Sequence, residues 1–482
     1  MTHRQRLTLV AAILGSGVAT LDGTIVNVAL PAIERDLGGG LTAQQWVVNA
    51  YLLALGSLIL VGGSLGDIYG ERRIFTVGLV GFGVCSVACA LAPTIGVLIA
   101  ARTLQGGAAA LLIPSSLAII IGAFSAKERG PAIGSWTAWG GIAAVVGPLA
   151  GGVIVDQGSW RWVFALNVPL VAATVVLVLA AVPRTAPVAG RRVDVLGAAL
   201  CATGLGGIVF ALIEQPRLGW SSPAIVVSLA GGALALVGFF AYERRAAQPM
   251  LRPSLFARRN FSVGNIETLA MYAGLAILFF YLVIFLQQVA GYSALEAGLA
   301  TLPTTLIMFS LSSRFGALAD RYGPRLFMGA GPLIAASGIL LLLRTGLNTS
   351  YLSDVLPAVL VFSLGLTMTV APLTATVLAD ADESDAGIAS AVNNAVARVA
   401  GLVGVPIAGV VAASTLVGDT FVADGASVDA FHRVVVICAA LVAAGGAVGA
   451  LGIANPRRAV EARRCPGGQL VGAPEPAVEH TS

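Results

Sequence analysis

Fourteen long apolar segments run through this chain of 482 residues, and they constrain its fold more than any other feature. A helix needs about 20 mostly apolar residues to cross the hydrocarbon core of a bilayer. The segments are roughly 7–31, 44–66, 74–93, 95–122, 132–155, 162–183, 194–214, 222–243, 261–288, 297–318, 326–344, 353–379, 388–414 and 432–454. The sequence therefore predicts an all-α integral membrane protein with 14 transmembrane helices.

The composition excludes several other classes of protein. Apolar residues make up 57% of the chain and charged residues only 11%, against about 25% charged residues in soluble domains. Such a chain has too little polar surface for a cytosolic enzyme, and it is too hydrophobic to be disordered. The net charge is +4 and the arginines are spread over short connectors, so the basic stripe that nucleic acid requires is missing.

Cysteine and histidine give no sign of a metal or disulfide site. Four of the five cysteines lie inside apolar segments and the fifth lies near the C-terminus; they are Cys85, Cys89, Cys201, Cys438 and Cys465. The three histidines are far apart in the sequence. Clustered ligands are needed for zinc, so we expect no metal. No catalytic constellation appears, so we expect no enzymatic activity and no cofactor. There is no ATP-binding Walker loop either, so we expect a gradient to supply the energy.

Basic residues alternate from one connector to the next. Cytoplasmic connectors of membrane proteins are enriched in arginine and lysine. If the N-terminus is inside, 20 basic residues fall on the inside connectors and termini and 5 fall on the outside ones. This bias predicts an even number of spans in the cytoplasmic (inner) membrane, with both termini in the cytoplasm.

A ten-residue turn occurs twice. GSLGDIYGER starts at Gly63 and GALADRYGPR starts at Gly316, and six of their ten positions are identical. Each copy follows the second helix of its half on the same side of the membrane, which indicates a parallel duplication. The predicted domains are a six-helix bundle over 1–183, two additional helices and a cytoplasmic linker over 184–260, a second six-helix bundle over 261–454, and a disordered cytoplasmic tail over 455–482.

This turn is a candidate gate. Its glycines permit a tight reversal of the chain, and Asp67 lies at the membrane boundary, where it can accept from a neighbouring arginine. One copy would be equally compatible with a stable turn and arginines that reach toward the interface. Two matching copies favour a gate that forms and breaks between the two halves. The candidate gate residues are Gly63, Asp67, Gly70, Arg72, Arg73, Asp320 and Arg325.

At these motifs the chain resembles the major facilitator superfamily, and in particular its fourteen-helix drug:proton antiporters. The repeated turn is similar to the signature loop of that family. Four further stretches look like its motifs in helices one, four, five and six: LDGTIVNVALP (Leu21–Pro31), RTLQGGAAA (Arg102–Ala110), GIAAVVGPLAGG (Gly141–Gly152) and WRWVFALNVP (Trp160–Pro169). The resemblance extends to about residue 454. It implies the major facilitator fold in a 6+2+6 arrangement, with a pseudo-twofold axis along the membrane normal.

Asp22 and Arg102 are charged residues inside predicted spans. An ionisable residue in a membrane is costly and is a functional candidate by default. At 1.5 Å per residue, Asp22 lies about 13 Å from the outer end of its helix and Arg102 about 10 Å from the outer end of its own. We expect a salt bridge that breaks when substrate enters and so lets the carboxylate take a proton. The alternative is a permanently paired, structural Asp22.

Glu267 and Arg398 repeat this pattern in the second half, each about 9–12 Å from the cytoplasmic end of its helix. Glu267 is a candidate for a second proton-carrying group, for recognition of a cationic substrate, or for a simple ion pair with Arg398. These three alternatives stay open at this point. The residues assigned to proton coupling are Asp22, Arg102 and Glu267.

The fifth helix and a set of polar and aromatic residues complete the candidate sites. Small residues let helices approach closely and proline kinks a helix. Generic packing explains that spacing equally well, but the resemblance implies an antiporter helix made by Gly147, Pro148, Gly151 and Gly152. A small-molecule cavity needs few polar anchors in apolar surroundings. The candidates are Thr24, Asn27, Asn49, Gln105, Trp136, Trp139, Asn265, Asn393 and Asn394.

The resemblance implies proton-coupled export of small, largely apolar drugs or antibiotics by alternating access. The expected partners are a small-molecule substrate, protons and the lipid bilayer, without nucleic acid, and we expect a monomer. In the fourteen-helix exporters of dicationic compounds, helices ten and thirteen tend to carry further acidic residues. The segments 297–318 and 388–414 contain none, which argues against such substrates. The alternatives are a gradient-driven nutrient importer (a symporter or facilitator) and a non-transporting membrane sensor.

Overall fold

The computed structural model describes residues 1–183, 193–246, 253–379, 386–416 and 418–455. The predicted tail therefore lies outside the described residues apart from its first position, and so do parts of the predicted linker. Thirteen helices in the described part are long and apolar enough to cross a bilayer. A bent pair, Gly40–Ile59 and Val61–Tyr69, meets at 50° and brings the number of spans to 14. This number agrees with the one predicted from the sequence.

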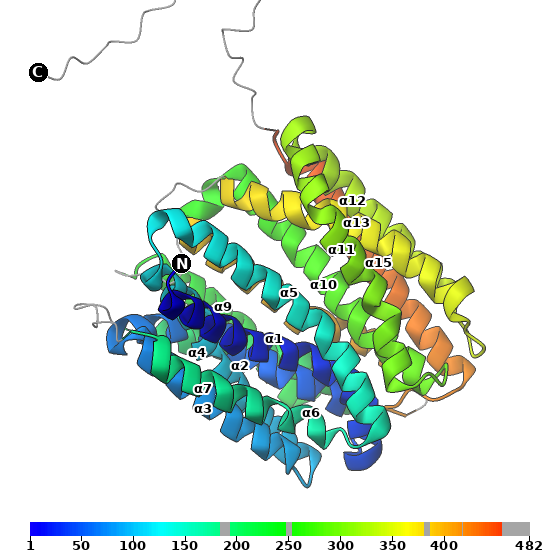
Figure 1. Ribbon diagram of the computed structural model, residues 1–482. Helices are drawn as coiled ribbons and strands as arrows, with labels where there is room; N and C mark the ends of the chain where they lie inside the picture. Colours follow the sequence, from blue (N-terminus) through cyan, green and yellow to red (C-terminus); the bar gives the residue numbers. More distant parts are fainter. Residues whose placement is uncertain (184–192, 247–252, 380–385, 417, 456–482) are drawn as a thin grey trace, which may run out of the picture.

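The helices form two bundles with a helical pair between them (Figure 1). The first bundle consists of α1 (His3–Leu37), α2 (Gly40–Tyr69), α3 (Glu71–Ala90), α4 (Ile95–Ala123), α5 (Ala126–Gln157), α6 (Arg161–Ala165) and α7 (Asn167–Ala181). The helical pair is α8 (Val195–Leu218) and α9 (Pro223–Glu243). The second bundle consists of α10 (Arg259–Gln288), α11 (Ala294–Tyr322), α12 (Pro324–Leu341), α13 (Leu356–Ala379), α14 (Ala386–Ala413) and α15 (Gly425–Gly452).

The repeated turn has the same structure in both bundles. Gly70 has φ of 89° and Gly323 has φ of 91°, a region of backbone space that favours glycine. Each glycine ends one helix and directly precedes the next. Arg72 donates from Nη2 to the carbonyl of Leu179 on α7 at 2.8 Å, and the equivalent Arg325 donates from Nε to the carbonyl of Ala450 on α15 at 2.5 Å. In this conformation each arginine therefore binds the last helix of its own bundle, and the cross-bundle gate stays a prediction.

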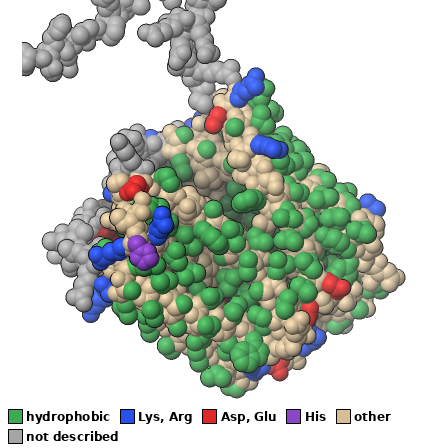
Figure 2. All heavy atoms as spheres, viewed as in Figure 1, with side chains coloured by type: hydrophobic (Ala, Val, Ile, Leu, Met, Phe, Trp, Pro, Cys, Tyr) green, Lys and Arg blue, Asp and Glu red, His purple; other side chains and the backbone are tan. Residues whose placement is uncertain are grey.

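The two ends of the molecule differ in how tightly the bundles meet. We call the end where α1 begins and α15 ends the terminal face, and the other end the opposite face. On α11, Phe309 in the middle of the helix is 78% exposed, whereas Ala297, near the opposite face, is fully buried. Likewise on α5, Trp139 is exposed but Gly152 is buried. Figure 2 shows the molecule hollowed between the bundles toward the terminal face.

An apolar cluster closes the opposite face. It joins α1 of the first bundle, including Ile25 and Leu30, to α10 of the second, including Tyr281 and Phe285. The Phe285 ring stacks on that of Phe431 with centroids 4.2 Å apart. The two bundles therefore share a packed core on this side of the molecule, and the hollow between them lies toward the terminal face.

The additional helices lie along one seam between the bundles. α8 packs against both α2 and α14. Leu205, Val209 and Ile213 of α8 form an apolar cluster with Leu402 of α14, and the indole Nε1 of Trp46 on α2 donates to a Glu214 carboxylate oxygen at 3.0 Å. The pair α8–α9 therefore covers the α2–α14 seam, while α5 and α11 meet at the other seam without such a cover.

We expect Gly365→Val to destabilise the protein by about 1–3 kcal/mol, the usual cost of overpacking. Gly365 of α13 faces the backbone of α12, and a Cβ there would collide with the amide of Ala335 and the carbonyl of Gly331. Gly231→Val in α9 is the control, because space around Gly231 is open. Thermal unfolding of the detergent-solubilised protein is the measurement. Equal melting temperatures for the two variants would contradict the packing described here.

Candidate functional site

Asp22 and Arg102 form an ion pair deep inside the first bundle. Asp22 lies in the middle of α1 and is fully buried, and Arg102 of α4 is 1% exposed. The guanidinium Nη1 lies 2.5 Å from the carboxylate Oδ2. The structure thus brings together the two charges that the sequence placed at similar depth.

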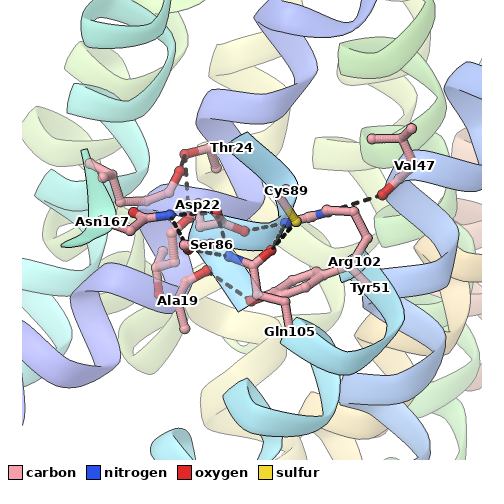
Figure 3. Close-up of polar contacts among 12 residues, drawn as sticks. Ala19, Asp22, Thr24, Val47, Tyr51, Ser86, Cys89, Arg102, Gln105 and Asn167 are labelled. Atoms are coloured by element: carbon pink, nitrogen blue, oxygen red, sulfur yellow. Dashed lines mark hydrogen bonds and ion pairs between the residues drawn. The ribbon is translucent and has the colours of Figure 1, made fainter. Parts of the chain in front are cut away.

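Two further donors complete the hydrogen bonding of the Asp22 carboxylate (Figure 3). Its Oδ1 accepts from Nε2 of Gln105 at 3.1 Å and from Nδ2 of Asn167 at 2.8 Å. Both amides also donate to the hydroxyl oxygen of Ser86, at 2.7 and 3.1 Å. The carboxylate therefore receives one charged and two neutral donors, which come from α4 and α7. Hydrogen bonds with a charged partner are stronger than those between neutral groups.

Arg102 is held on its other sides by α2 and by its own helix. Its Nε donates to the carbonyl of Val47 at 3.1 Å and its Nη1 donates to Oε1 of Gln105 at 2.8 Å. The guanidinium lies 4.2 Å from the centroid of the Tyr51 ring, a cation–π contact. Taking a charge pair out of water is costly unless its remaining donors and acceptors are satisfied. Here α1, α2, α4 and α7 together satisfy the pair.

Ser86, Asn167 and Tyr51 were not among the site residues predicted from the sequence. Asn167 lies in the stretch Trp160–Pro169 that carried part of the family resemblance, and it is a polar residue within an apolar run. That position was a signal for a functional amide. Ser86 and Tyr51 gave no such signal, because single hydroxyl groups are common in apolar helices. Only the packing of α2, α3 and α7 around α1 shows their role.

Glu267 lies apart from this network and does not pair with Arg398. It is fully buried in α10, and neither carboxylate oxygen has a hydrogen-bond partner in the described part of the chain. A Cβ built on Gly449 would touch the carboxylate Oε2 and the carbonyl of Met328. The side chain therefore points toward α15 and α12, inside the second bundle, and away from the first bundle.

Arg398 of α14 faces the first bundle and is half-buried. It lies near enough to Tyr51 for an electrostatic interaction with the phenol. Its neighbours Val399 and Leu402 pack against α8. Among the described residues it forms no ion pair and no hydrogen bond, so this cation approaches the Asp22–Arg102 network from the second bundle without a counter-charge of its own.

Asn393 and Asn265, two of the candidate cavity residues, lie together between α14 and α10. Asn393 of α14 donates to Oδ1 of Asn265 at 3.3 Å and to Oγ1 of Thr268 at 2.8 Å, both on α10. Three candidates have buried polar atoms without a partner in the described structure: Asn27 with its Oδ1, Asn49 with its whole amide and Trp136 with its indole Nε1.

The remaining candidates lie at the margins of the passage. Trp139 is 55% exposed and Asn394 is also exposed. Trp136 packs on the small apolar cluster formed by α1, α4 and α5. Thr24 donates to carbonyls of its own helix at 3.0 and 3.3 Å and lies beside Gly147. Gln105 belongs to the Asp22 network, so the structure separates it from the other cavity candidates.

The glycines of the fifth helix contact both bundles. A Cβ on Gly147 or Gly151 would collide with Thr24 or Ile25 of α1, and one on Gly152 would collide with Leu295 of α11. Gly298 of α11 in turn approaches the carbonyl of Pro148. α5 therefore lies between α1 and α11 at backbone distance, on the closed side of the molecule.

The described residues offer no cluster of three or more histidine, cysteine or acidic side chains that could hold a metal ion. The cysteines within the described ranges are free. The contacts of the Asp22 carboxylate are an ion pair with Arg102 and hydrogen bonds from Gln105 and Asn167.

Comparison with known proteins agrees with this fold. The chain is 39% identical over 409 residues to a puromycin resistance protein of Streptomyces alboniger, covering 83% of this chain and 80% of that protein. It is 36% identical over 422 residues to a probable actinorhodin transporter of Streptomyces coelicolor, covering 84% and 72%. A bacterial homologue of the human lysosomal transporter Spinster, solved in an inward-facing and unoccupied conformation, superposes with a TM-score of 0.66 at 15% identity, covering 94% and 97%.

A family model described as Major Facilitator Superfamily matches residues 12–405. This match covers most of the first bundle, the helical pair and the second bundle up to the middle of α14. The chain therefore belongs to the major facilitator superfamily.

Proposed function

We propose that this protein exports small, largely apolar compounds across the cytoplasmic membrane in exchange for protons, by alternating access. The observation that carries the proposal is the Asp22–Arg102 ion pair, which lies buried among the spans of the first bundle. Ionisable groups inside a membrane are costly, and they mark ion pathways and proton relays. The names of the relatives, which include a puromycin resistance protein and a tetracenomycin C resistance and export protein, support drugs as the cargo.

We assign the terminal face to the cytoplasm. Its connectors hold clusters of arginine, among them Arg72 and Arg73 at the first repeated turn and Arg321 and Arg325 at the second. The excess of basic residues on cytoplasmic connectors supports this orientation. With this assignment the described conformation faces inward, since the bundles separate toward the terminal face and meet on the opposite face.

We take the inward-facing state as the substrate-free step of the cycle, in which Asp22 is paired with Arg102. In the proposed cycle, the proton that Asp22 carried has been released to the cytoplasm before this pair forms. Entry of a substrate or opening toward the outside separates α1 from α4 and removes the Arg102 donor. Asp22 then takes a proton from the outside, and the pair re-forms after the return. One proton moves in for each compound that moves out.

The charges along the passage favour neutral, monocationic or anionic compounds over dicationic ones. Arg398 presents an uncompensated cation near Tyr51, and Glu267 points away from the first bundle. A dicationic compound would need carboxylates on the passage, and Asp22 is already occupied by Arg102. Apolar pockets with few polar anchors are typical of small-molecule sites. Asn27, Asn49 and Asn393 are candidates for those anchors.

The fold by itself does not decide the direction of transport. A D-xylose–proton symporter superposes with a TM-score of 0.61 at 16% identity, and the nutrient importer therefore remains the second candidate. Export is favoured by the relatives named for resistance and export. A sensor without transport is disfavoured, because the buried ion pair and the open passage serve no purpose in such a protein.

The parent protein should release protons from the acidic lumen of everted vesicles when puromycin or a related antibiotic is added. We expect Asp22→Asn to abolish this release, because the amide cannot exchange a proton. A fluorescent pH indicator measures this release. Asp36→Asn is the matched control on the same helix, because Asp36 pairs with Arg161 at the surface. Full proton release by Asp22→Asn would contradict the coupling role of Asp22.

We expect Arg102→Met to lower the free energy of unfolding by about 3–5 kcal/mol, because it leaves the Asp22 carboxylate buried without its counter-charge. The double variant Asp22→Asn/Arg102→Met removes both charges and should recover most of that loss. Thermal unfolding of the purified protein measures both effects. If the single variant is as stable as the parent, the pair does not provide the charge balance described here.

A further inference from the structure

Each bundle provides the acceptors for the first turn of a helix in the other bundle. At the start of α11, the backbone amide of Ala294 donates to Oδ1 of Asp156 at 2.9 Å and that of Leu295 donates to Oδ2 at 2.8 Å. Asp156 lies at the end of α5, in the first bundle. The third free amide of this turn, that of Glu296, donates to the hydroxyl of Ser293 within the same bundle.

The start of α2 has the reverse arrangement. The amide of Thr42 donates to Oδ2 of Asp419 at 3.0 Å, and the amide of Leu41 donates to the Asp419 carbonyl at 2.5 Å. Asp419 lies in the connection between α14 and α15, in the second bundle. A Cβ on Gly40 would collide with the Asp419 carbonyl. Glycine at that position therefore lets the connection of the second bundle reach the helix start.

These two contacts, which we call the cross-bundle caps, are related by the internal repeat. α2 and α11 are the second helices of their bundles and carry the repeated turn at their other ends. Asp156 ends the fifth helix of the first bundle, and Asp419 follows the fifth helix of the second bundle, α14. Both caps lie on the opposite face, beside a pocket of about 610 Å³ that Asp156, Glu34 and Gln288 help to line.

A carboxylate at a helix N-terminus satisfies amides that have no partner within the helix and interacts favourably with the helix dipole. Both cross-bundle caps exist only while the bundles meet on the opposite face. Opening of that face separates each carboxylate from the helix that it caps. An interaction present in one state of a two-state equilibrium shifts the population toward that state. The caps therefore stabilise closure on top of what the apolar cluster contributes.

We propose that Asp156 and Asp419 are positioning residues of the transport cycle, which set how often the opposite face opens by capping α11 and α2 across the two bundles. This inference rests on the proposed function only in assuming that the bundles separate on this face. Its test measures opening directly and requires no substrate and no proton gradient, so it can fail while export is confirmed, or hold while export is not found.

The experiment measures the rate at which a membrane-impermeant maleimide modifies Val28→Cys from the outside, in a chain whose five native cysteines are replaced by alanine. Val28 is 1% exposed and its carbonyl accepts from Gln287 of α10 at 3.0 Å, so it lies at the closed seam. Modification there requires opening. Loss of one N-cap shifts an equilibrium about fivefold. We therefore expect the modification rate to rise about fivefold for Asp156→Ala or Asp419→Ala and about 25-fold for the double variant.

The matched control is Asp424→Ala. Asp424 caps α15 through the amide of Ser427 at 2.8 Å, on the same face but within one bundle. Its loss should destabilise the protein as any lost cap does and leave the modification rate unchanged. Asp156→Asn keeps one carbonyl acceptor and should restore most of the slow rate. Unchanged rates in Asp156→Ala, Asp419→Ala and the double variant would overturn the proposal, and so would an equal rise in Asp424→Ala.

Discussion

The interior of a bilayer offers no water, so a charged group within a span is costly unless it finds a partner inside the protein. The Asp22–Arg102 pair finds such partners in each other, and Gln105, Asn167 and the Val47 carbonyl add further hydrogen bonds. Four helices of the first bundle must be in place for this to happen. The arrangement of α1, α2, α4 and α7 and the ion pair of Asp22 therefore depend on each other, which supports the proton coupling that we propose.

The second bundle repeats the helices of the first but not its chemistry. The equivalent turns share their glycine conformations and their arginine contacts. However, Glu267 has no partner among the described residues and faces α15, while Arg398 stands apart from it. Duplication thus preserved the frame of the bundle, and the charged network belongs to one half. Of the three alternatives considered for Glu267, the simple ion pair with Arg398 is not formed in this conformation.

The two faces of the molecule are closed by different means. On the opposite face an apolar cluster, the glycines of α5 and the cross-bundle caps hold the bundles together. On the terminal face, Arg72 and Arg325 of the repeated turns each donate to the last helix of their own bundle. Non-directional apolar packing tolerates sliding, whereas a capped helix start has one geometry. The closed face thus combines non-directional apolar packing with hydrogen bonds of fixed geometry.

The sequence by itself determined the number of spans, the duplication and the depth of the main charges. Length and hydropathy are local properties, and a bilayer converts them directly into helices. Depth along a helix follows from its rise per residue, and so Asp22 and Arg102 could be matched. Tertiary structure alone decided which side of each helix faces which neighbour. It brought Ser86, Asn167 and Tyr51 to the ion pair and turned Glu267 away from the passage. It also placed Asp156 and Asp419 at helices of the other bundle. The reason is that packing, rather than local sequence, sets the rotation of a helix about its axis and the contacts between distant segments.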